Sequence, residues 1–66
     1  MTLIVNGEAC EVEAATLAAL LDALEYGEEA KVATALNGDF VPARLREATP
    51  VKDGDRIEIL APRQGG

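Results

Sequence analysis

Alternation of apolar and polar residues predicts a β-hairpin at the start of the chain. Residues 2–6 are a short aliphatic run, and residues 9–13 alternate apolar side chains with glutamates. The Asn6-Gly7 pair between them is typical of a two-residue hairpin turn, because both turn positions take a positive φ. The pattern therefore predicts two antiparallel strands joined by a tight turn.

A helix is expected after the hairpin. Leucines recur there at positions i, i+3, i+4 and i+7, a spacing that places them along one helical stripe. They are Leu17, Leu20, Leu21 and Leu24. Thr16 can cap the start of the helix, and Gly27 can close it as a left-handed C-terminal cap. We expect the stripe to face the core, because a sheet needs one covering layer.

A second hairpin is expected downstream. Residues 31–37 are typical of a third strand, and Asn37-Gly38 repeats the tight-turn signal before a short extended piece at residues 40–42. Pro42 restricts that piece to the edge or the end of a sheet.

The last part of the chain predicts one more strand. Residues 44–48 are compatible with a single irregular helical turn, and Asp53-Gly54-Asp55 predicts a turn before a strand at residues 56–61. We interpret both aspartates as turn residues. Side chains in a strand alternate between its two faces. One face would carry Ile57 and Ile59, and the other Arg56, Glu58 and Leu60.

The order of elements favours an α+β fold of the β-grasp, ubiquitin-like type. A ββαββ chain can form a mixed sheet of four to five strands, covered on one face by a single main helix, with the last strand parallel to the first. A ferredoxin-like alternative needs a second full helix, and residues 44–48 are too few for one. We expect a β-grasp domain over residues 1–62 and a flexible tail over residues 63–66.

The composition predicts a small aliphatic core. The chain has 66 residues, 48% of them hydrophobic and 3% aromatic, so we expect a core of Leu, Ile, Val and Ala with Phe40 and Tyr26 as its rings. A domain this short cannot enclose a deep active site.

Charge and cysteine content limit the function further. A net charge of −6 with scattered basic residues argues against a nucleic-acid partner, and it fits either docking on a basic protein surface or simple solubility. One cysteine and no histidine exclude an internal disulfide, a zinc site and an activated Cys10 nucleophile, so we expect a reducing, cytoplasmic location and Cys10 in apolar packing. No segment is typical of a membrane span or a signal peptide.

The terminal Gly65-Gly66 pair is the candidate chemical group. Glycines allow a backbone to thread a narrow channel, and the five residues from Pro62 onward reach about 16 to 18 Å at most. The Gly66 carboxylate is ionised at neutral pH and can attack the α-phosphate of ATP, but the chain has no phosphate-binding loop or paired catalytic carboxylates to promote this step. We expect a partner enzyme to activate Gly66, and this chain not to be an enzyme itself.

Four segments form a recognisable combination: the leucine-rich helix, ALNGDFVP at residues 35–42, DGDRIEIL at residues 53–60 and the end Gln64-Gly65-Gly66. Together they resemble the ThiS family, the sulfur carriers of thiamine biosynthesis. The resemblance covers essentially the whole chain. Two departures occur beyond Pro42: Ala43 stands where the family often has Arg, and Leu45 or Arg46 where it has an aromatic residue.

The resemblance implies a carrier cycle. Gly66 would be adenylated by a ThiF-type enzyme with ATP and converted to a thiocarboxylate by cysteine-derived sulfur from a cysteine desulfurase system. A ThiG-type thiazole synthase would accept the sulfur. Gly65 and Gln64 would thread into the partner, no cofactor or metal would be bound, and neither nucleic acid nor membrane would be a partner.

Side chains near the tail are candidates for docking. We expect Leu60 to point away from the helix into an apolar patch for partner enzymes, and Arg63 to pair with an acidic partner residue. An exposed leucine and a solvated arginine without such roles are equally compatible with the sequence. The alternatives for the whole chain are a carrier for another pathway, such as molybdopterin synthesis, and a ubiquitin-like modifier conjugated through Gly66.

Overall fold

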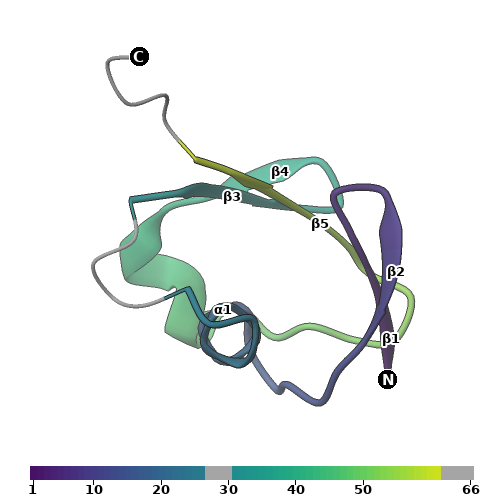
Figure 1. The fold of residues 1–66 in the computed structure, drawn as a ribbon. Coiled ribbons are helices and arrows are strands. Elements are labelled where there is room, and N and C mark those ends of the chain that lie inside the picture. Colours follow the sequence, from purple (N-terminus) through teal and green to yellow (C-terminus); the bar gives the residue numbers. More distant parts are fainter. Residues whose placement is uncertain (27–30, 62–66) are drawn as a thin grey trace.

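A five-stranded mixed sheet with one α-helix on one face makes up the part of the chain that the structure, a computed structural model, describes, namely residues 1–26 and 31–61 (Figure 1). The strand order is β2-β1-β5-β3-β4. The last strand therefore lies in the centre of the sheet, between the two hairpins. This is the predicted β-grasp arrangement.

The first hairpin pairs β1 (Thr2–Val5) with β2 (Glu8–Glu11) in antiparallel register. Its turn has φ of 52° at Asn6 and 85° at Gly7, the two positive values that the Asn-Gly pair predicts. The second hairpin pairs β3 (Ala33–Leu36) with β4 (Asp39–Val41) and turns at Asn37 and Gly38 with φ of 51° and 90°. Both turns are confirmed.

β5 (Arg56–Leu60) joins the two hairpins. It is parallel to β1 through Ile4↔Arg56 and Val5↔Ile57, and antiparallel to β3 through four residue pairs. The expected parallel pairing of the last strand with the first is confirmed.

The leucine helix forms, but it ends earlier than predicted. α1 (Leu17–Ala23) begins at Thr16, whose hydroxyl accepts a hydrogen bond from the amide of Ala19 at 3.1 Å. At its end the amides of Glu25 and Tyr26 donate to the carbonyls of Asp22 and Leu21, and Glu25 has φ of 69°. This is a Schellman cap in which Glu25 takes the left-handed position expected for Gly27. Gly27 itself lies outside the described residues.

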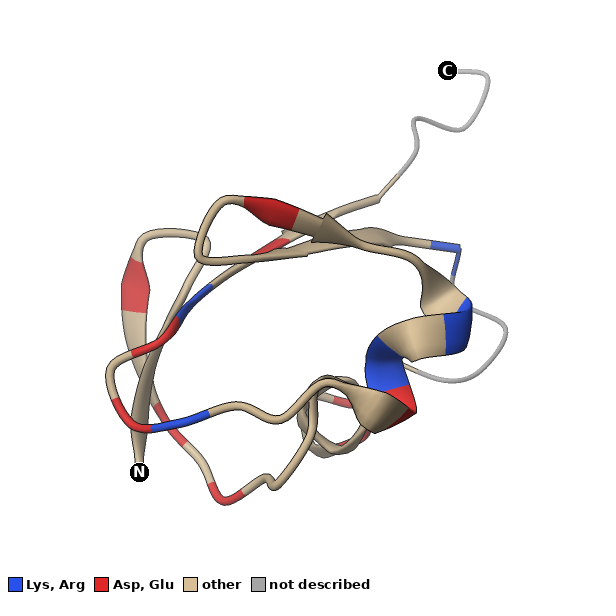
Figure 2. Cartoon of the chain, turned by 180° about the vertical axis from the view of Figure 1, so that it is seen from behind, with Lys and Arg blue, Asp and Glu red and all other residues tan. Residues whose placement is uncertain are grey.

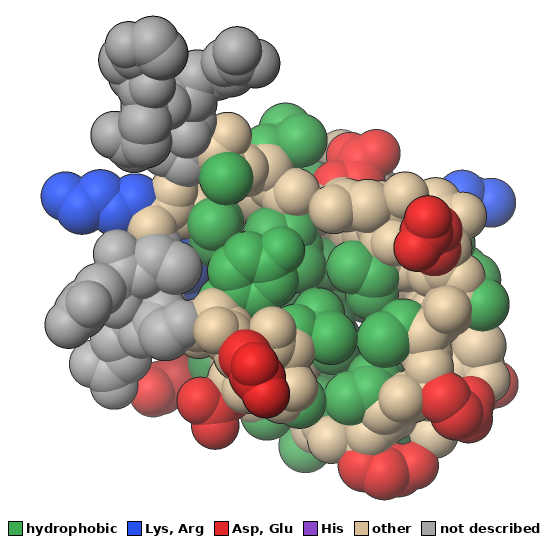
Figure 3. All heavy atoms as spheres, in the orientation of Figure 1, with side chains coloured by type: hydrophobic (Ala, Val, Ile, Leu, Met, Phe, Trp, Pro, Cys, Tyr) green, Lys and Arg blue, Asp and Glu red, His purple; other side chains and the backbone are tan. Residues whose placement is uncertain are grey.

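The core lies between α1 and the inner face of the sheet. Leucines of the helical stripe fill it together with aliphatic residues from the strands and loops, and Figure 3 shows hydrophobic side chains gathered between the sheet and the helix. The buried core residues are Leu3, Ala14, Leu17, Leu20, Leu21, Val41, Val51, Ile57 and Ile59. Leu24 and Tyr26 pack against this core while remaining partly exposed.

One core prediction is wrong. Phe40 is 69% exposed and lies on the outer face of the sheet. Its neighbour Val41 pairs with the buried Thr34, which commits Val41 to the inner face. Because adjacent side chains in a strand point to opposite faces, Phe40 must point outward.

The remaining differences concern boundaries. The expected strands 31–37 and 56–61 extend beyond the observed β3 and β5, and the expected strand 9–13 begins one residue after β2 and ends two residues beyond it. The irregular turn is a 3₁₀ helix, η1 (Ala43–Ala48), that follows Pro42. The division between a domain at residues 1–62 and a tail at residues 63–66 stays a prediction, because the tail lies outside the described residues.

Candidate functional site

The candidate site lies at the carboxyl end of β5. Of the residues expected there, Leu60 is described, whereas Arg63, Gln64, Gly65 and Gly66 lie outside the described residues. The structure therefore positions the strand from which the tail continues.

Leu60 lies on the outer face of the sheet, away from α1, as predicted. Burial alternates along β5, with Ile57 and Ile59 buried and Leu60 67% exposed. Leu60 pairs with Ala33 of β3. Lys31, Val32 and Ala61 complete a hollow around these two residues that opens to solvent.

Phe40 extends this apolar surface across β3. It pairs with Ala35, whose next neighbour on the same face of β3 is Ala33, the partner of Leu60. We call Phe40, Ala35, Ala33 and Leu60 the open-face patch. Glu58 pairs with Ala35 from the other side and borders the patch with a carboxylate. Sequence reasoning missed Phe40, because Phe40 and Val41 are both apolar and their order alone does not show which of them faces the core.

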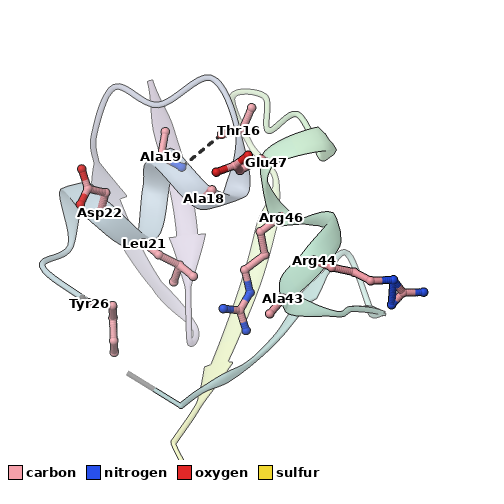
Figure 4. A pocket seen from close by; sticks show the side chains of 10 residues that line it. All are labelled: Thr16, Ala18, Ala19, Leu21, Asp22, Tyr26, Ala43, Arg44, Arg46 and Glu47. Atoms are coloured by element: carbon pink, nitrogen blue, oxygen red, sulfur yellow. Dashed lines mark hydrogen bonds between the residues drawn. The ribbon is translucent and has the colours of Figure 1, made fainter. Parts of the chain in front are cut away.

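A groove runs between α1 and η1, and Figure 4 shows the side chains that line it. Thr16, Ala18, Ala19, Leu21, Asp22, Tyr26, Ala43, Arg44, Arg46 and Glu47 line it. Arg44 points away from the groove (Figure 4), and Arg46 donates its Nε to the Thr34 hydroxyl at 3.1 Å and a terminal nitrogen to the Val32 carbonyl at 2.6 Å. These bonds assign Arg46 to holding η1 against β3.

The aspartates before β5 act as turn residues, as predicted. Asp53 accepts a hydrogen bond from the Thr2 amide at 2.7 Å, and Asp55 accepts one from the Lys52 amide at 2.8 Å. The Asn37 side chain also donates to Asp55 at 3.1 Å, and these donors together hold the pKa of the Asp55 carboxyl below its ordinary value.

A second group of acidic side chains surrounds the amino terminus. The Met1 ammonium donates to Glu13 at 2.6 Å and lies 3.7 Å from Glu11. The hydrogen bond to Glu13 raises the pKa of this amino group, and the charges of Glu13 and Glu11 act in the same direction.

Charged residues are distributed over separate elements. Figure 2 shows basic residues on η1, just before β3 and around the start of β5, with acidic residues between and beyond them. Among residues 1–26 and 31–61, no three His, Cys, Asp or Glu side chains are grouped to hold a metal ion. No helix in the same ranges is long and apolar enough to cross a membrane. Cys10 is half-buried and has a free thiol.

Comparison with known proteins assigns a family to this architecture. The model of the ThiS family matches residues 3–66. The chain belongs to the ThiS family. A search of curated proteins finds no match.

Solved structures agree with membership of the ThiS family. The crystal structure of the thiamine biosynthesis protein ThiS from Geobacter metallireducens is 38% identical with a TM-score of 0.82, and the alignment covers 100% of both chains. The NMR solution structure of a thiamine biosynthesis protein from the same organism is 38% identical with a TM-score of 0.80, and the alignment covers 100% of this chain and 88% of that one. The expected ubiquitin-like β-grasp fold is confirmed.

The departures from the usual ThiS pattern fall on η1. Ala43 and Leu45 are both exposed, with Leu45 at 44%. The Arg46 guanidinium donates hydrogen bonds to the Thr34 hydroxyl and the Val32 carbonyl. The departures therefore lie in the groove and on the surface beside it, outside the core and β5.

Proposed function

We propose that this chain is a sulfur carrier for thiazole formation in thiamine biosynthesis. The observation that carries the proposal is the match to the ThiS family over residues 3–66. The full-length similarity to a structure named as a thiamine biosynthesis protein supports it. The chain acts as a protein cosubstrate and not as an enzyme.

The reacting group is the carboxylate of Gly66. One carboxylate oxygen attacks the α-phosphate of ATP in the site of a ThiF-type enzyme, which forms the acyl-adenylate and releases pyrophosphate. A cysteine desulfurase system supplies cysteine-derived sulfur as a persulfide, which attacks the acyl carbon as AMP leaves, and a thiol reductant then cleaves the sulfur–sulfur bond with two electrons. The resulting thiocarboxylate donates its sulfur to a ThiG-type thiazole synthase. ATP and the sulfur donor are used by these partners, in a cytoplasmic setting, and the carrier binds neither as a cofactor.

The body and the tail have different roles in this proposal. Gly65 and Gln64 pass through the narrow channel of the partner, and the absence of a side chain at Gly65 lets the backbone fit next to the reacting terminus. The open-face patch contacts the partner outside the channel. Its two large side chains, Phe40 and Leu60, are 69% and 67% exposed and are available for burial. Arg63 pairs with an acidic residue of the partner.

Intact-mass measurement tests the chemistry. The chain is incubated with a ThiF-type enzyme, ATP, cysteine, a desulfurase and a thiol reductant, and we expect one oxygen at the C-terminus to be replaced by sulfur. A variant that lacks Gly66 should remain unmodified. An unchanged mass for the wild-type chain, with an enzyme that modifies its own carrier in parallel, contradicts the proposal.

The same reaction separates the two alternatives. Conjugates of higher mass that require Gly66 would identify a protein modifier. Sulfur transfer to a molybdopterin synthase partner, with no thiazole formed when a ThiG-type thiazole synthase is added, would identify a carrier for molybdopterin synthesis.

Substitution of the open-face patch tests docking. Phe40→Ser should raise the KM for the carrier about tenfold or more, because burial of a large apolar side chain contributes about 1.5 to 3 kcal/mol. Leu45→Ser is the matched control, since Leu45 is also an exposed hydrophobic residue but lies on η1. Equal KM values for the two variants would exclude a specific role for the patch.

A further inference from the structure

The Asn6 side chain forms two hydrogen bonds with the backbone of a single residue in β5. Its Nδ2 donates to the Ile59 carbonyl at 3.1 Å, and the Ile59 amide donates to its Oδ1 at 2.8 Å. Both bonds are partly buried. The side-chain amide thus pairs with Ile59 as a neighbouring strand would.

Ile59 requires this partner because β1 ends too early to supply one. β1 pairs with β5 at Arg56 and Ile57, and the Asn6 amide donates to the Ile57 carbonyl at 2.9 Å. Alternate residues of a strand direct their backbone groups to the same side. The groups of Ile59 therefore point toward the space beyond β1, where among the described residues the Asn6 side chain meets them.

The turn conformation makes this contact available. Asn6 has φ of 52°, a left-handed value that asparagine tolerates better than most residues. In the turn its side chain can reach back across to β5 while its own amide continues the pairing. One residue thus completes the hairpin and extends the sheet toward the carboxyl end of β5.

We infer that Asn6 is a positioning residue for the C-terminal tail. By pairing with Ile59 it holds the last residues of β5 in the sheet, so that the chain beyond Ala61 starts from a fixed point and direction. Without these bonds the strand end would fray on the β1 side, and the partner enzyme would have to order it on binding. This inference rests on the proposed function.

Asn37 provides a matched control within the same molecule. It also precedes a glycine in a two-residue turn, with φ of 51°. Its side chain accepts from the Arg56 amide at 3.0 Å and donates to Asp55 at 3.1 Å. Asn37 therefore holds the beginning of β5, whereas Asn6 holds the end next to the tail.

The experiment compares Asn6→Gly with Asn37→Gly. Glycine removes the side chain and readily adopts a positive φ, so both hairpin turns are retained. Amide hydrogen exchange at Ile59 is measured by NMR well below the unfolding transition of each variant. Steady-state adenylation by a ThiF-type enzyme is monitored through the release of pyrophosphate. It gives kcat and the KM for the carrier.

Only Asn6→Gly is expected to loosen the strand end. Exchange at Ile59 should become about tenfold faster than in Asn37→Gly, after correction for global stability, because its hydrogen bond is lost. The KM for the carrier should rise about three- to tenfold with kcat within about twofold, since the ordering cost falls on binding. Asn6→Asp retains the acceptor for the Ile59 amide, and its exchange rate and KM should lie between those of wild type and Asn6→Gly.

Two results would overturn the inference. One is an unchanged exchange rate at Ile59 in Asn6→Gly, and the other is the same KM in the two glycine variants. If the wild-type chain is not adenylated at all, the proposed function fails, and the exchange rate at Ile59 still decides whether Asn6 holds the strand end.

Discussion

Thr34 carries a buried hydroxyl that connects three elements of the fold. The residue is 1% exposed, its hydroxyl donates to the Val41 carbonyl at 2.8 Å, and it accepts from the Arg46 Nε at 3.1 Å. Thr34→Val retains the shape of the side chain and removes both bonds. The substitution thus isolates the contribution of one hydroxyl that joins β3 to β4 and η1.

The expected loss of stability is about 2 to 3 kcal/mol. A neutral hydrogen bond contributes about 1 kcal/mol, a bond to a charged group contributes about 1.5 to 3 kcal/mol, and buried groups left without a partner incur a desolvation penalty. Arg46 retains its bond to the Val32 carbonyl and some contact with solvent, which limits the penalty. At about 0.05 to 0.15 kcal/mol per residue, a domain of 66 residues has a total stability of only about 3 to 10 kcal/mol, so the loss should be easy to detect.

Urea unfolding followed by circular dichroism measures this difference. Thr2→Val is the matched control, because the Thr2 hydroxyl bonds to the exposed Glu11 at 2.7 Å. The control should change stability by no more than about 0.5 kcal/mol. If Thr34→Val is as stable as Thr2→Val, the buried hydroxyl does not hold these elements together.

Three further predictions use the same unfolding assay. Leu20→Ala should lose about 3 kcal/mol, because Leu20 is 0% exposed in the core, whereas Leu60→Ala should change stability by less than about 0.5 kcal/mol; similar losses would contradict the assignment of faces. Glu25→Gly should gain up to about 1 kcal/mol, because glycine fits the φ of 69° at the helix cap without strain, and a loss would count against the Schellman cap. Asp55→Asn should weaken the acid dependence of stability, because the pKa of Asp55 is lowered in the folded chain. The stability that the Asp55 carboxylate contributes is complete above its ordinary pKa of 3.8 and is lost as the pH falls below that value. An unchanged pH profile would contradict this role of Asp55.

Local sequence signals were sufficient for most of the fold. The turns at Asn6 and Asn37 depend on backbone conformations that few residue types adopt, and the leucine stripe from Leu17 onward depends on helical periodicity. These signals arise within a few residues of the sequence. Their order then favoured one sheet topology, which the pairing of β5 with β1 and β3 confirms.

The incorrect or missing predictions concern contacts between distant segments. The outward position of Phe40 follows from the register of β4 against Thr34, which the sequence of β4 alone does not determine. The early helix end at Glu25 reflects backbone hydrogen bonds that override the preference for glycine. The roles of Asn6 and Arg46 depend on partners in β5 and β3, at separations where short-range patterns carry no information.

β5 belongs both to the core and to the open-face patch. Ile57 and Ile59 are buried, and Leu60 lies on the opposite face within the open-face patch. A shift of the strand by one residue would expose both isoleucines and bury charged side chains, so the core fixes the register. Because the chain continues from the same strand, that register also determines which face of the sheet Leu60 shares with the open-face patch at the point where the described residues end. In the proposed function, β5 held at both of its ends by Asn37 and Asn6 would present the chain beyond Ala61 to a partner in one orientation.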